Sequence, residues 1–446
     1  MLKGMLGSTI PRALRTAAIV VGFTLVVQYY LRSFQETTGP LLTQEGNPGT
    51  GEGGHGQLEH EQAHEEQPSQ TNATVWDVLK SDPRVSRFAD MVAMFEDIVQ
   101  GLSAPKAKFT VYAPINEAVA NAFVPHDPPW FYWKYLVGYH MGPGALSEKA
   151  LANTATVSSF VHADIFFTYQ QRISTQNDLH ASANGKITFN HKATHIASAP
   201  DSACVNGFVH LIDGLLELPD STASILRQRP SLATFHRGLI LSGLSDVVND
   251  TNKHVGQTLF APTNVAFDHL GPKVKRFLFS PWGRPYLEAL LKFHIVANHT
   301  LFSDVYFPHG GADMVAIAGA NPKQAAPSSS SEHDKRLLQF QLPTLHSGAN
   351  ITARPVQSQG RSHLSVSLGQ EREGSSAIKV SIPDIVVMDG VIHEIDYMLL
   401  PPTQRPHQRA TGTRGLFTAL RRATTSYDEN IEVEDIIERL GPFLVQ

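Results

Sequence analysis

One fifteen-residue stretch of the sequence occurs twice, and this repetition limits the possible folds more than any other feature. Residues 205–219 read VNGFVHLIDGLLELP, and residues 388–402 read MDGVIHEIDYMLLPP. A long segment that recurs with its polar and apolar positions in the same order predicts two copies of one domain. The shared or matched polar and turn residues are Asn206 and Asp389, Gly207 and Gly390, His210 and His393, and Asp213 and Asp396.

Each copy begins with a turn pair, Asn206-Gly207 or Asp389-Gly390, between apolar runs. Such pairs tolerate the positive φ angles of a two-residue hairpin turn. The residues that follow, 208–212 and 391–395, have one clearly apolar face, which is typical of a strand against a core. We therefore expect a hairpin and its return strand in each domain.

Two further motifs precede each copy. Residues 110–119, TVYAPINEAV, match residues 258–267, TLFAPTNVAF. Each predicts a short strand, a break at Pro114 or Pro262, and a helix that starts with Asn116 or Asn264 near its cap. A third pair, Tyr139-His140 and Phe293-His294, ends an apolar run in each half.

These three motifs, in this order, resemble those of the fasciclin domain. That family has a first motif like TVFAPTNEAF, a middle Tyr-His and a second motif like NGVIHVIDGVLLP. The resemblance covers roughly residues 72–219 and 222–402. It implies an α+β fold class, with two tandem fasciclin-like domains, each a wedge of short strands with helices on one side.

Composition excludes some functions. The chain has 446 residues, of which 42% are hydrophobic, so most of it can bury a core. Its net charge of −5 leaves no basic field of the size that nucleic-acid binding requires. Cys204 is the single cysteine, so an intramolecular disulfide is impossible.

The N-terminal 71 residues predict a membrane attachment and a stalk. Residues 16–31 are apolar and are flanked by cations. This pattern favours the interpretation of residues 1–32 as an uncleaved signal anchor, with a cleaved signal peptide as the alternative. Either places the rest of the chain in the lumen or outside the cell. Residues 33–71 are polar and predict a disordered linker. His60 and His64 there suggest a weak metal site, but a solvated acidic tract explains them better.

The second domain is longer than the first. Seventy positions separate His140 from His210, whereas 99 separate His294 from His393. We expect an insert near residues 310–374, with an exposed, mobile loop that includes residues 321–335. Residues 403–446 form a C-terminal tail, and its apolar positions predict an amphipathic helix over residues 431–440.

We find no motif that carries catalytic chemistry. The sequence lacks GxSxG, HExxH, CxxC and a phosphate-binding glycine loop. His210 and Asp213, like their counterparts His393 and Asp396, are three residues apart, which on a strand puts them on opposite faces. We expect each histidine to pack beside the core and each aspartate to cap the next turn. No enzyme activity, catalytic residue, metal, cofactor or small-molecule substrate is expected.

The resemblance points to protein contacts instead. In some adhesive members of the family the Tyr-His region is linked to receptor binding, which makes Tyr139, His140, Phe293 and His294 possible partner contacts. Phe293 lacks the tyrosine hydroxyl, and a role of both histidines in the core is the default interpretation. Four N-x-Ser/Thr sequons, at Asn72, Asn249, Asn298 and Asn350, predict glycosylation if the domains are lumenal.

These observations predict a non-enzymatic, membrane-anchored glycoprotein, similar to fungal members of the family, that acts in cell adhesion or contacts other cell-surface proteins. One alternative keeps the fold and changes the place, because fasciclin-like proteins of the vacuole or other endomembranes are implicated in membrane traffic such as autophagosome fusion. The other is a ligand-binding or hydrolytic protein that uses a groove near His140 or His294.

Overall fold

The structure is a computed structural model. It describes residues 72–122, 128–161, 171–178, 186–196, 202–251, 254–307, 315–316, 339–358, 361–369, 377–402 and 431–444. The predicted membrane segment, residues 16–31, and the predicted linker, residues 33–71, lie outside the described residues. Two tandem domains of mixed helices and strands follow, which confirms the predicted α+β class.

The centre of each domain is a pair of parallel strands. In the first domain β1 (Phe109–Pro114) pairs with β8 (Gly207–Ile212), and in the second β9 (Gln257–Pro262) pairs with β18 (Gly390–Ile395). Pro114 lies opposite Ile212, and Pro262 lies opposite Ile395. The two motifs of each domain, about 100 or more residues apart in sequence, are therefore adjacent strands.

Antiparallel strands flank each pair in the same order. The first sheet runs β2-β1-β8-β7, and the second begins β10-β9-β18-β17. All six residues of β1, β9 and β18 are buried, so these strands are covered on both faces. The flanking strands are β2 (Met141–Pro143), β7 (Ser202–Cys204), β10 (Ile295–Ala297) and β17 (Ile378–Val387).

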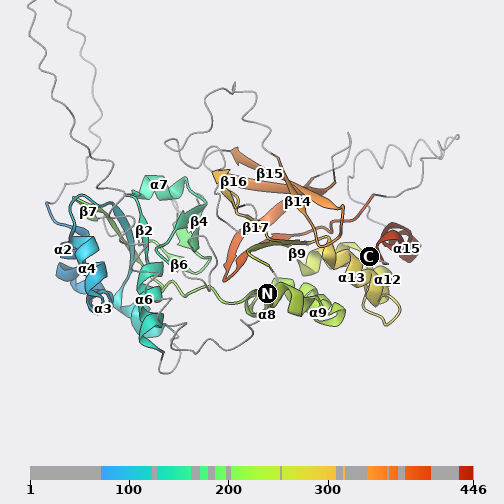
Figure 1. The fold of residues 1–446 in the computed structure, drawn as a ribbon, viewed down its shortest axis with the longest axis horizontal. Helices are drawn as coiled ribbons and strands as arrows, with labels where there is room; N and C mark the ends of the chain where they lie inside the picture. Colours follow the sequence, from blue (N-terminus) through green and yellow to red (C-terminus); the bar gives the residue numbers. More distant parts are fainter. Residues whose placement is uncertain are drawn as a thin grey trace, which may run out of the picture.

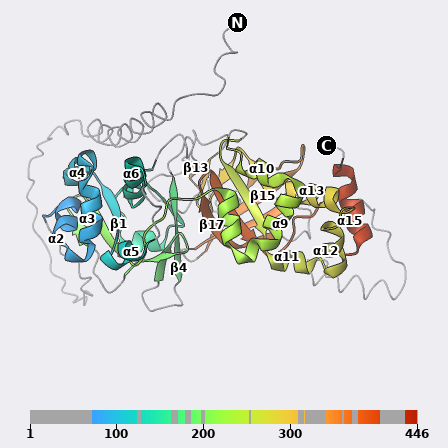
Figure 2. The same cartoon turned by 90° about the horizontal axis from the view of Figure 1, so that it is seen from below.

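The helices of residues 75–103 lie at one end of the molecule and those of residues 272–292 and 433–440 towards the other (Figures 1 and 2), with strands of both domains between them. Their apolar residues enter the core of their own domain. The helices of the first domain are α2 (Val75–Ser81), α3 (Ser86–Ala93), α4 (Glu96–Ser103), α5 (Asn116–Asn121), α6 (Trp130–Tyr139) and α7 (Glu148–Ala152). Those of the second are α8 (Thr222–Gln228), α9 (Ala233–Ser242), α10 (Leu244–Asn249), α11 (Asn264–His269), α12 (Pro272–Leu278) and α13 (Arg284–Lys292).

The hairpins before β8 and β18 form, but their turns lie one residue earlier than the sequence predicts. Cys204 pairs with Gly207 and Val387 pairs with Gly390, so the glycines are already strand residues. Gly207 has φ +149° and Gly390 has φ +157°. Both are needed for space: a Cβ on Gly207 would lie 1.9 Å from the carbonyl oxygen of Phe109, and one on Gly390 2.1 Å from that of Gln257.

Much of the predicted insert is sheet. Residues 340–368 contribute β14 (Phe340–Pro343), β15 (Asn350–Ser358) and β16 (Arg361–Leu368), which extend the sheet beyond β17 to seven strands. Between Tyr139-His140 and β8 the first domain instead has a separate four-stranded sheet. Residues 317–338, where a loop was predicted, lie outside the described residues. The separate sheet consists of β3 (Thr156–Ser158), β4 (Arg172–Asp178), β5 (Lys186–Phe189) and β6 (Ala193–Thr194).

The predicted C-terminal helix forms as α15 (Val433–Leu440), and it packs on the second domain. Ile436 and Leu440 are fully buried in that domain's core. The turn η6 (Gly441–Phe443) follows and places Phe443 against Phe293, with ring centroids 4.9 Å apart. The C-terminal segment therefore completes the second domain.

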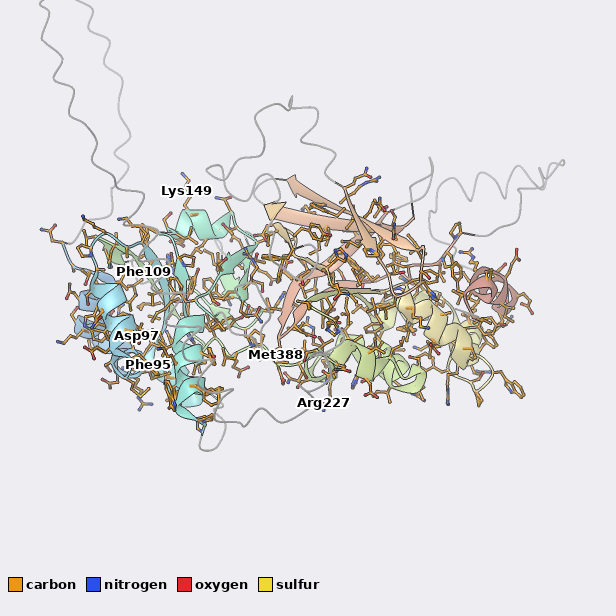
Figure 3. All side chains as sticks on the ribbon, viewed as in Figure 1. Phe95, Asp97, Phe109, Lys149, Arg227 and Met388 are labelled. Carbon is orange, nitrogen blue, oxygen red and sulfur yellow. The ribbon has the colours of Figure 1, made fainter. Side chains whose placement is uncertain are left out.

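The two domains share a buried junction. Met388, from the β17–β18 turn of the second domain, packs against the core of the first and lies between the two bodies in Figure 3. Gln171, fully buried, donates from Nε2 to the carbonyl oxygens of Val387 at 3.2 Å and Met388 at 3.3 Å. Contacts between β4 and β17 complete the junction.

Candidate functional site

The second residue of each turn, Asn206 or Asp389, is buried and anchors the segments around it. The Asn206 side chain accepts from the backbone N–H of Val75, at the start of α2, at 2.8 Å. It also donates to the carbonyl oxygen of Leu102, at the end of α4, at 2.7 Å. Asn206 thus ties two helices to the edge of the sheet.

Asp389 occupies the equivalent place in the second domain with different partners. Its carboxylate accepts from Thr222 Oγ1 at 3.0 Å, from Gln257 Nε2 at 2.6 Å and from His254 Nε2 at 2.9 Å. Thr222 is the first residue of α8, so the link between sheet and leading helix is preserved. The charge of Asp389 is compensated by side-chain donors, where Asn206 uses backbone groups.

Asn116 and Asn264 do not cap the helices that they begin. The Asn116 amide accepts from Arg87 N at 3.0 Å and donates to Pro83 O at 2.8 Å. Asn264 does the same with Thr234 N, at 2.9 Å, and Pro230 O, at 2.8 Å. Each asparagine therefore joins its helix to the 3-10 turn and the helix that follow the first helix of the domain, a contact between distant residues that local capping rules cannot predict.

His140 and His294 lie in the interior with both ring nitrogens engaged. His140 Nδ1 is 2.8 Å from Leu136 O, and Nε2 accepts from the backbone N–H of Leu216 at 2.9 Å. The corresponding distances for His294 are 2.9 Å to Leu290 O and 3.0 Å from Leu399 N. These partners fix the neutral tautomer with the proton on Nδ1. Burial lowers the pKa of each histidine from 6.5 to about 4.

Each histidine joins two segments of its own domain. His140 connects α6 to the segment after β8, and His294 connects α13 to the segment after β18. Leu216 and Leu399 are matched positions of the repeated motif, so the same clamp is built twice. Both rings are wholly shielded from solvent. A buried neutral imidazole that already holds two backbone groups has no free nitrogen to offer a substrate.

Tyr139 and Phe293, beside these histidines, are also fully buried. The Tyr139 hydroxyl donates to Arg172 O at 2.8 Å and accepts from Asn190 Nδ2 at 2.9 Å, which ties α6 to the separate four-stranded sheet of the first domain. Phe293 instead packs against His346, at 4.5 Å between centroids, and Phe443. The missing hydroxyl is thus replaced by apolar contacts with the C-terminal segment.

The structure therefore places all four possible contact residues, Tyr139, His140, Phe293 and His294, inside their domains. Each supports the fold in the way that the core interpretation expects. Direct contact with a partner would require the domain to open. The partner-contact role stays a prediction.

His210 and His393 are buried on the central strands, as expected. His210 Nε2 lies 2.7 Å from Leu146 O, and His393 Nε2 lies 2.7 Å from Leu301 O. Their aspartates do not cap the next turn. Asp213 accepts from the backbone N–H of Thr194 at 2.5 Å, and Asp396 accepts from Thr263 Oγ1 at 2.7 Å. Both carboxylates join neighbouring segments, and neither bonds its histidine.

All four sequon asparagines, Asn72, Asn249, Asn298 and Asn350, are exposed. Asn298 has φ +61°, and its Oδ1 accepts from Val255 N at 2.9 Å, so its loop is well defined. Surface exposure is what attachment of a glycan requires. Their use stays a prediction.

Within the described ranges no cluster of histidine, cysteine, aspartate and glutamate could hold a metal ion. The histidines of the predicted linker, His60 and His64, lie outside those ranges. No helix in the described part of the chain has the length and apolar character needed to cross a membrane. Cys204 is half-buried, and burial raises the pKa of its thiol to about 11.

The most exposed large apolar side chain among the described residues is Trp282, at 83% of its maximum. It lies in the turn between α12 and α13, where Ser280 accepts from Arg284 N at 3.1 Å and from Gly283 N at 3.1 Å. A Cβ on Gly283 would lie 1.9 Å from Phe277 O, so the turn folds tightly against α12. The tryptophan is held outward by a rigid turn.

Arginines flank this turn. Arg276 lies on α12 and Arg284 begins α13, and both are exposed. Neither forms an ion pair within the described part of the chain, whereas Lys275 pairs with Asp268 at 2.6 Å. Tryptophan and arginine are enriched at the energetic centres of protein interfaces. Sequence reasoning missed this surface, although a tryptophan between two prolines in SPWGRPY signals a displayed turn.

Comparisons with known proteins agree with the repeated architecture. The model of the fasciclin domain matches residues 83–219 and 230–401. Aurofusarin biosynthesis cluster protein S of Gibberella zeae is 44% identical over 437 residues, which is 97% of this chain and 97% of that protein.

More distant relatives share only part of their length with this chain. Stabilin-2 of Rattus norvegicus is 23% identical over 50% of this chain and 15% of its own length. Periostin of Homo sapiens is 26% identical over 45% of this chain and 22% of its own. A solved FAS1 domain pair from the insect cell adhesion molecule fasciclin I covers 71% of this chain and 97% of that chain, with 18% identity and a TM-score of 0.34.

Proposed function

Because the chain belongs to the fasciclin-domain family and carries two copies of the domain, we propose that it is a non-enzymatic interaction protein. The observation that carries this proposal is the contrast between its interior and its surface. His140 and His294 are neutral and bonded in the interior, while Trp282 is displayed on a rigid turn beside two exposed arginines. This contrast supports binding of a protein partner at the surface around Trp282.

The Trp282 surface fits a protein partner with an acidic patch. Arg276 and Arg284 offer charge-assisted hydrogen bonds to carboxylates, and Trp282 offers a large area for burial at little cost in conformational freedom. Removal of a central tryptophan from an interface commonly costs about 2 kcal/mol or more, roughly thirtyfold in Kd.

Aurofusarin biosynthesis cluster protein S matches along nearly its whole length, and it supports a role beside biosynthetic proteins. We infer that this chain is an accessory protein of a small-molecule pathway, attached to a membrane through residues 16–31, with glycosylated domains in the lumen or outside the cell. Cell adhesion is the second candidate, because the fasciclin domain that matches residues 83–219 and 230–401 also occurs in adhesive members of the family.

Gene disruption in the native cell separates these candidates. The accessory role predicts that a small-molecule product of the culture disappears and returns with the wild-type gene, but not with the double variant Trp282→Ala, Arg284→Glu. Val265→Ala, which alters a different exposed apolar side chain of the second domain, is the matched control and should restore the product. An unchanged metabolite profile with weaker cell–cell cohesion would support adhesion.

Imaging of the full-length protein with a C-terminal tag tests the location. Signal at the cell periphery or on internal membranes agrees with a secretory-pathway protein. Signal on the vacuole would favour the membrane-traffic alternative. Diffuse cytosolic signal would exclude the membrane attachment, and with it the glycosylation.

A further inference from the structure

The domain junction contains two carboxylates and one guanidinium, all buried. Asp304 lies in the turn between β11 (Thr300–Leu301) and β12 (Val305–Phe307), and Asp384 lies in β17. Arg172 reaches them from β4 of the first domain. Their whole-residue exposures are 4%, 3% and 7%. Buried ionic groups are costly unless each is compensated, so their arrangement requires an explanation.

Asp304 makes the direct connection between the domains. Its carboxylate accepts from the backbone N–H of Thr156 at 2.8 Å and from Thr156 Oγ1 at 2.5 Å. Arg172 donates from Nη2 to Thr156 O at 2.8 Å and lies 3.9 Å from Asp304 Oδ2. The guanidinium also stacks over Phe302, 5.7 Å from the ring centroid. Thr156 and Arg172 of the first domain thus both contact the carboxylate of Asp304, which belongs to the second domain.

Asp384 is the second carboxylate of this cluster. It accepts from Ser303 N at 2.8 Å and from Ser303 Oγ, so it is fixed directly beside Asp304. Its backbone is in the left-handed region, with φ +58°, at an irregularity of the β17–β18 pairing. Its backbone N–H donates to His393 Nδ1 at 3.2 Å.

The charges of the cluster balance only if one acid is neutral. Arg172 can compensate one carboxylate, and Asp304 already accepts its two strong bonds. Among the described residues, the other ionisable groups that face Asp384 are His191, which bonds to the backbone at Asp384 and Pro383, and His393 on β18. Burial lowers the pKa of both histidines to about 4, so neither supplies a positive charge near neutral pH.

We propose that the junction is a proton-operated clasp, closed while Asp384 carries a proton and loosened when that proton is lost. A charged Asp384 would leave one uncompensated negative charge between the domains, and opening the junction to water would solvate it. Two effects agree with this assignment: burial, and then the neighbouring Asp304, raise the pKa of Asp384 to about 7.

The direction of the pH effect follows from the linkage between protonation of Asp384 and opening of the junction. The closed form binds the proton more tightly than an open form in which Asp384 is solvated, so acid favours closure and rising pH favours opening. A carboxyl that titrates near its ordinary value in the open form and near neutrality in the closed form predicts an opening equilibrium that rises roughly 10- to 100-fold between pH 5 and pH 8.

The Thr156 amide is a direct reporter, because its hydrogen bond crosses the junction. Hydrogen exchange of the full chain should show less protection of Thr156 at pH 8 than at pH 5, relative to Val111 in β1, after correction for the intrinsic pH dependence of exchange. Asp384→Asn should remove this difference, and asparagine also accepts a left-handed backbone. Asp268→Asn, an exposed carboxylate of the same domain, is the matched control and should keep it.

A second measurement does not depend on a variant that folds. Small-angle scattering of the wild-type protein should show a larger radius of gyration at pH 8 than at pH 5. Equal protection of Thr156 and an equal radius at both pH values would overturn the clasp. So would an Asp384→Asn protein that folds and retains the wild-type pH dependence.

Discussion

At Gly207 and Gly390 the backbones of two parallel strands approach so closely that no side chain fits. The obstacle in each domain is a carbonyl oxygen of the partner strand, 1.9 Å or 2.1 Å from an added Cβ. The sequence indicates glycine for a turn, but the residue is required because a strand passes. This requirement depends on a residue about 100 positions away, which no local pattern contains.

Alanine at either position should therefore destabilise its own domain. We expect Gly207→Ala to cost more than about 2 kcal/mol of unfolding free energy, since a backbone must move to relieve the overlap. The control is Gly144→Ala, where φ is +88° but nothing lies within 4 Å of the new Cβ. It should cost about 1 kcal/mol from conformational strain alone. Urea denaturation measures both, and equal losses would refute the steric argument.

The buried histidines predict how domain stability depends on pH. The folded pKa of His294 is about 4, below its ordinary value of 6.5, so unfolding takes up a proton between these values. Stability should fall as pH decreases from 6.5 towards 4, by about 1–2 kcal/mol per such histidine at pH 5. This sign is opposite to that of Asp384.

A comparison of two variants isolates the effect of this histidine. His294→Gln should unfold with a smaller loss of stability between pH 7 and pH 5 than wild type, whatever its stability at pH 7. His269→Gln, which changes an exposed histidine of the same domain, should behave like wild type. Chemical denaturation at the two pH values gives the result, and identical pH dependence in all three proteins would contradict it.

At the scale of elements, the sequence predicts the strands of the repeated motifs better than the elements that occur in one domain alone. Helix α15 is indicated by its apolar period, and the central strands by two matched motifs. The apolar run that leads to Phe293-His294 forms α13, which ends at Lys292, and Ile295 starts the flanking strand β10. Apolar residues satisfy a helix and a buried strand equally well, so the pattern cannot locate that boundary.

The docking of α15 was not predictable from its own residues. An amphipathic period shows that one face is buried without showing what covers it. The answer comes from Phe293, which replaces the tyrosine of the first domain and leaves an apolar position for Phe443 to fill. Two features distinguish the second domain from the first, Phe293 in place of tyrosine and the additional helix α15. The contact could be predicted only if these two features were considered together.

Two adjacent isoleucines of α15 test the docking. Ile436 is fully buried and Ile437 is 39% exposed. Ile436→Ala should lower the free energy of unfolding of the second domain by about 2–5 kcal/mol, while Ile437→Ala should change it by roughly 0.5 kcal/mol or less. Thermal unfolding of the two variants decides the matter. Similar effects would mean that α15 does not pack as described.

At the scale of the whole molecule, the repeated motifs predict the tandem fold, whereas they do not indicate the contact surface that we propose around Trp282. The expectation centred on the Tyr-His pairs, which lie inside, and passed over Trp282, which occurs in one domain alone. Repetition identifies what two domains need in order to fold. A surface specific to one copy leaves no such signal.

The sequons give a prediction for the complete protein. Because Asn72, Asn249, Asn298 and Asn350 are all exposed, passage through the secretory pathway should glycosylate the chain. Peptide-N-glycosidase treatment of protein from the native cell should increase its electrophoretic mobility. Asn298→Gln should remove one step of that change. Unchanged mobility would argue against lumenal domains.

The reach of Met388 across the junction sets an order of events during synthesis. The ribosome completes the first domain's own residues more than 160 positions before Met388 emerges, yet that side chain packs against the first domain's hydrophobic core. During synthesis the first domain therefore lacks this contact until most of the second domain has been made. A nascent chain that stalls or is cleaved between the domains would leave the apolar surface under Met388 uncovered.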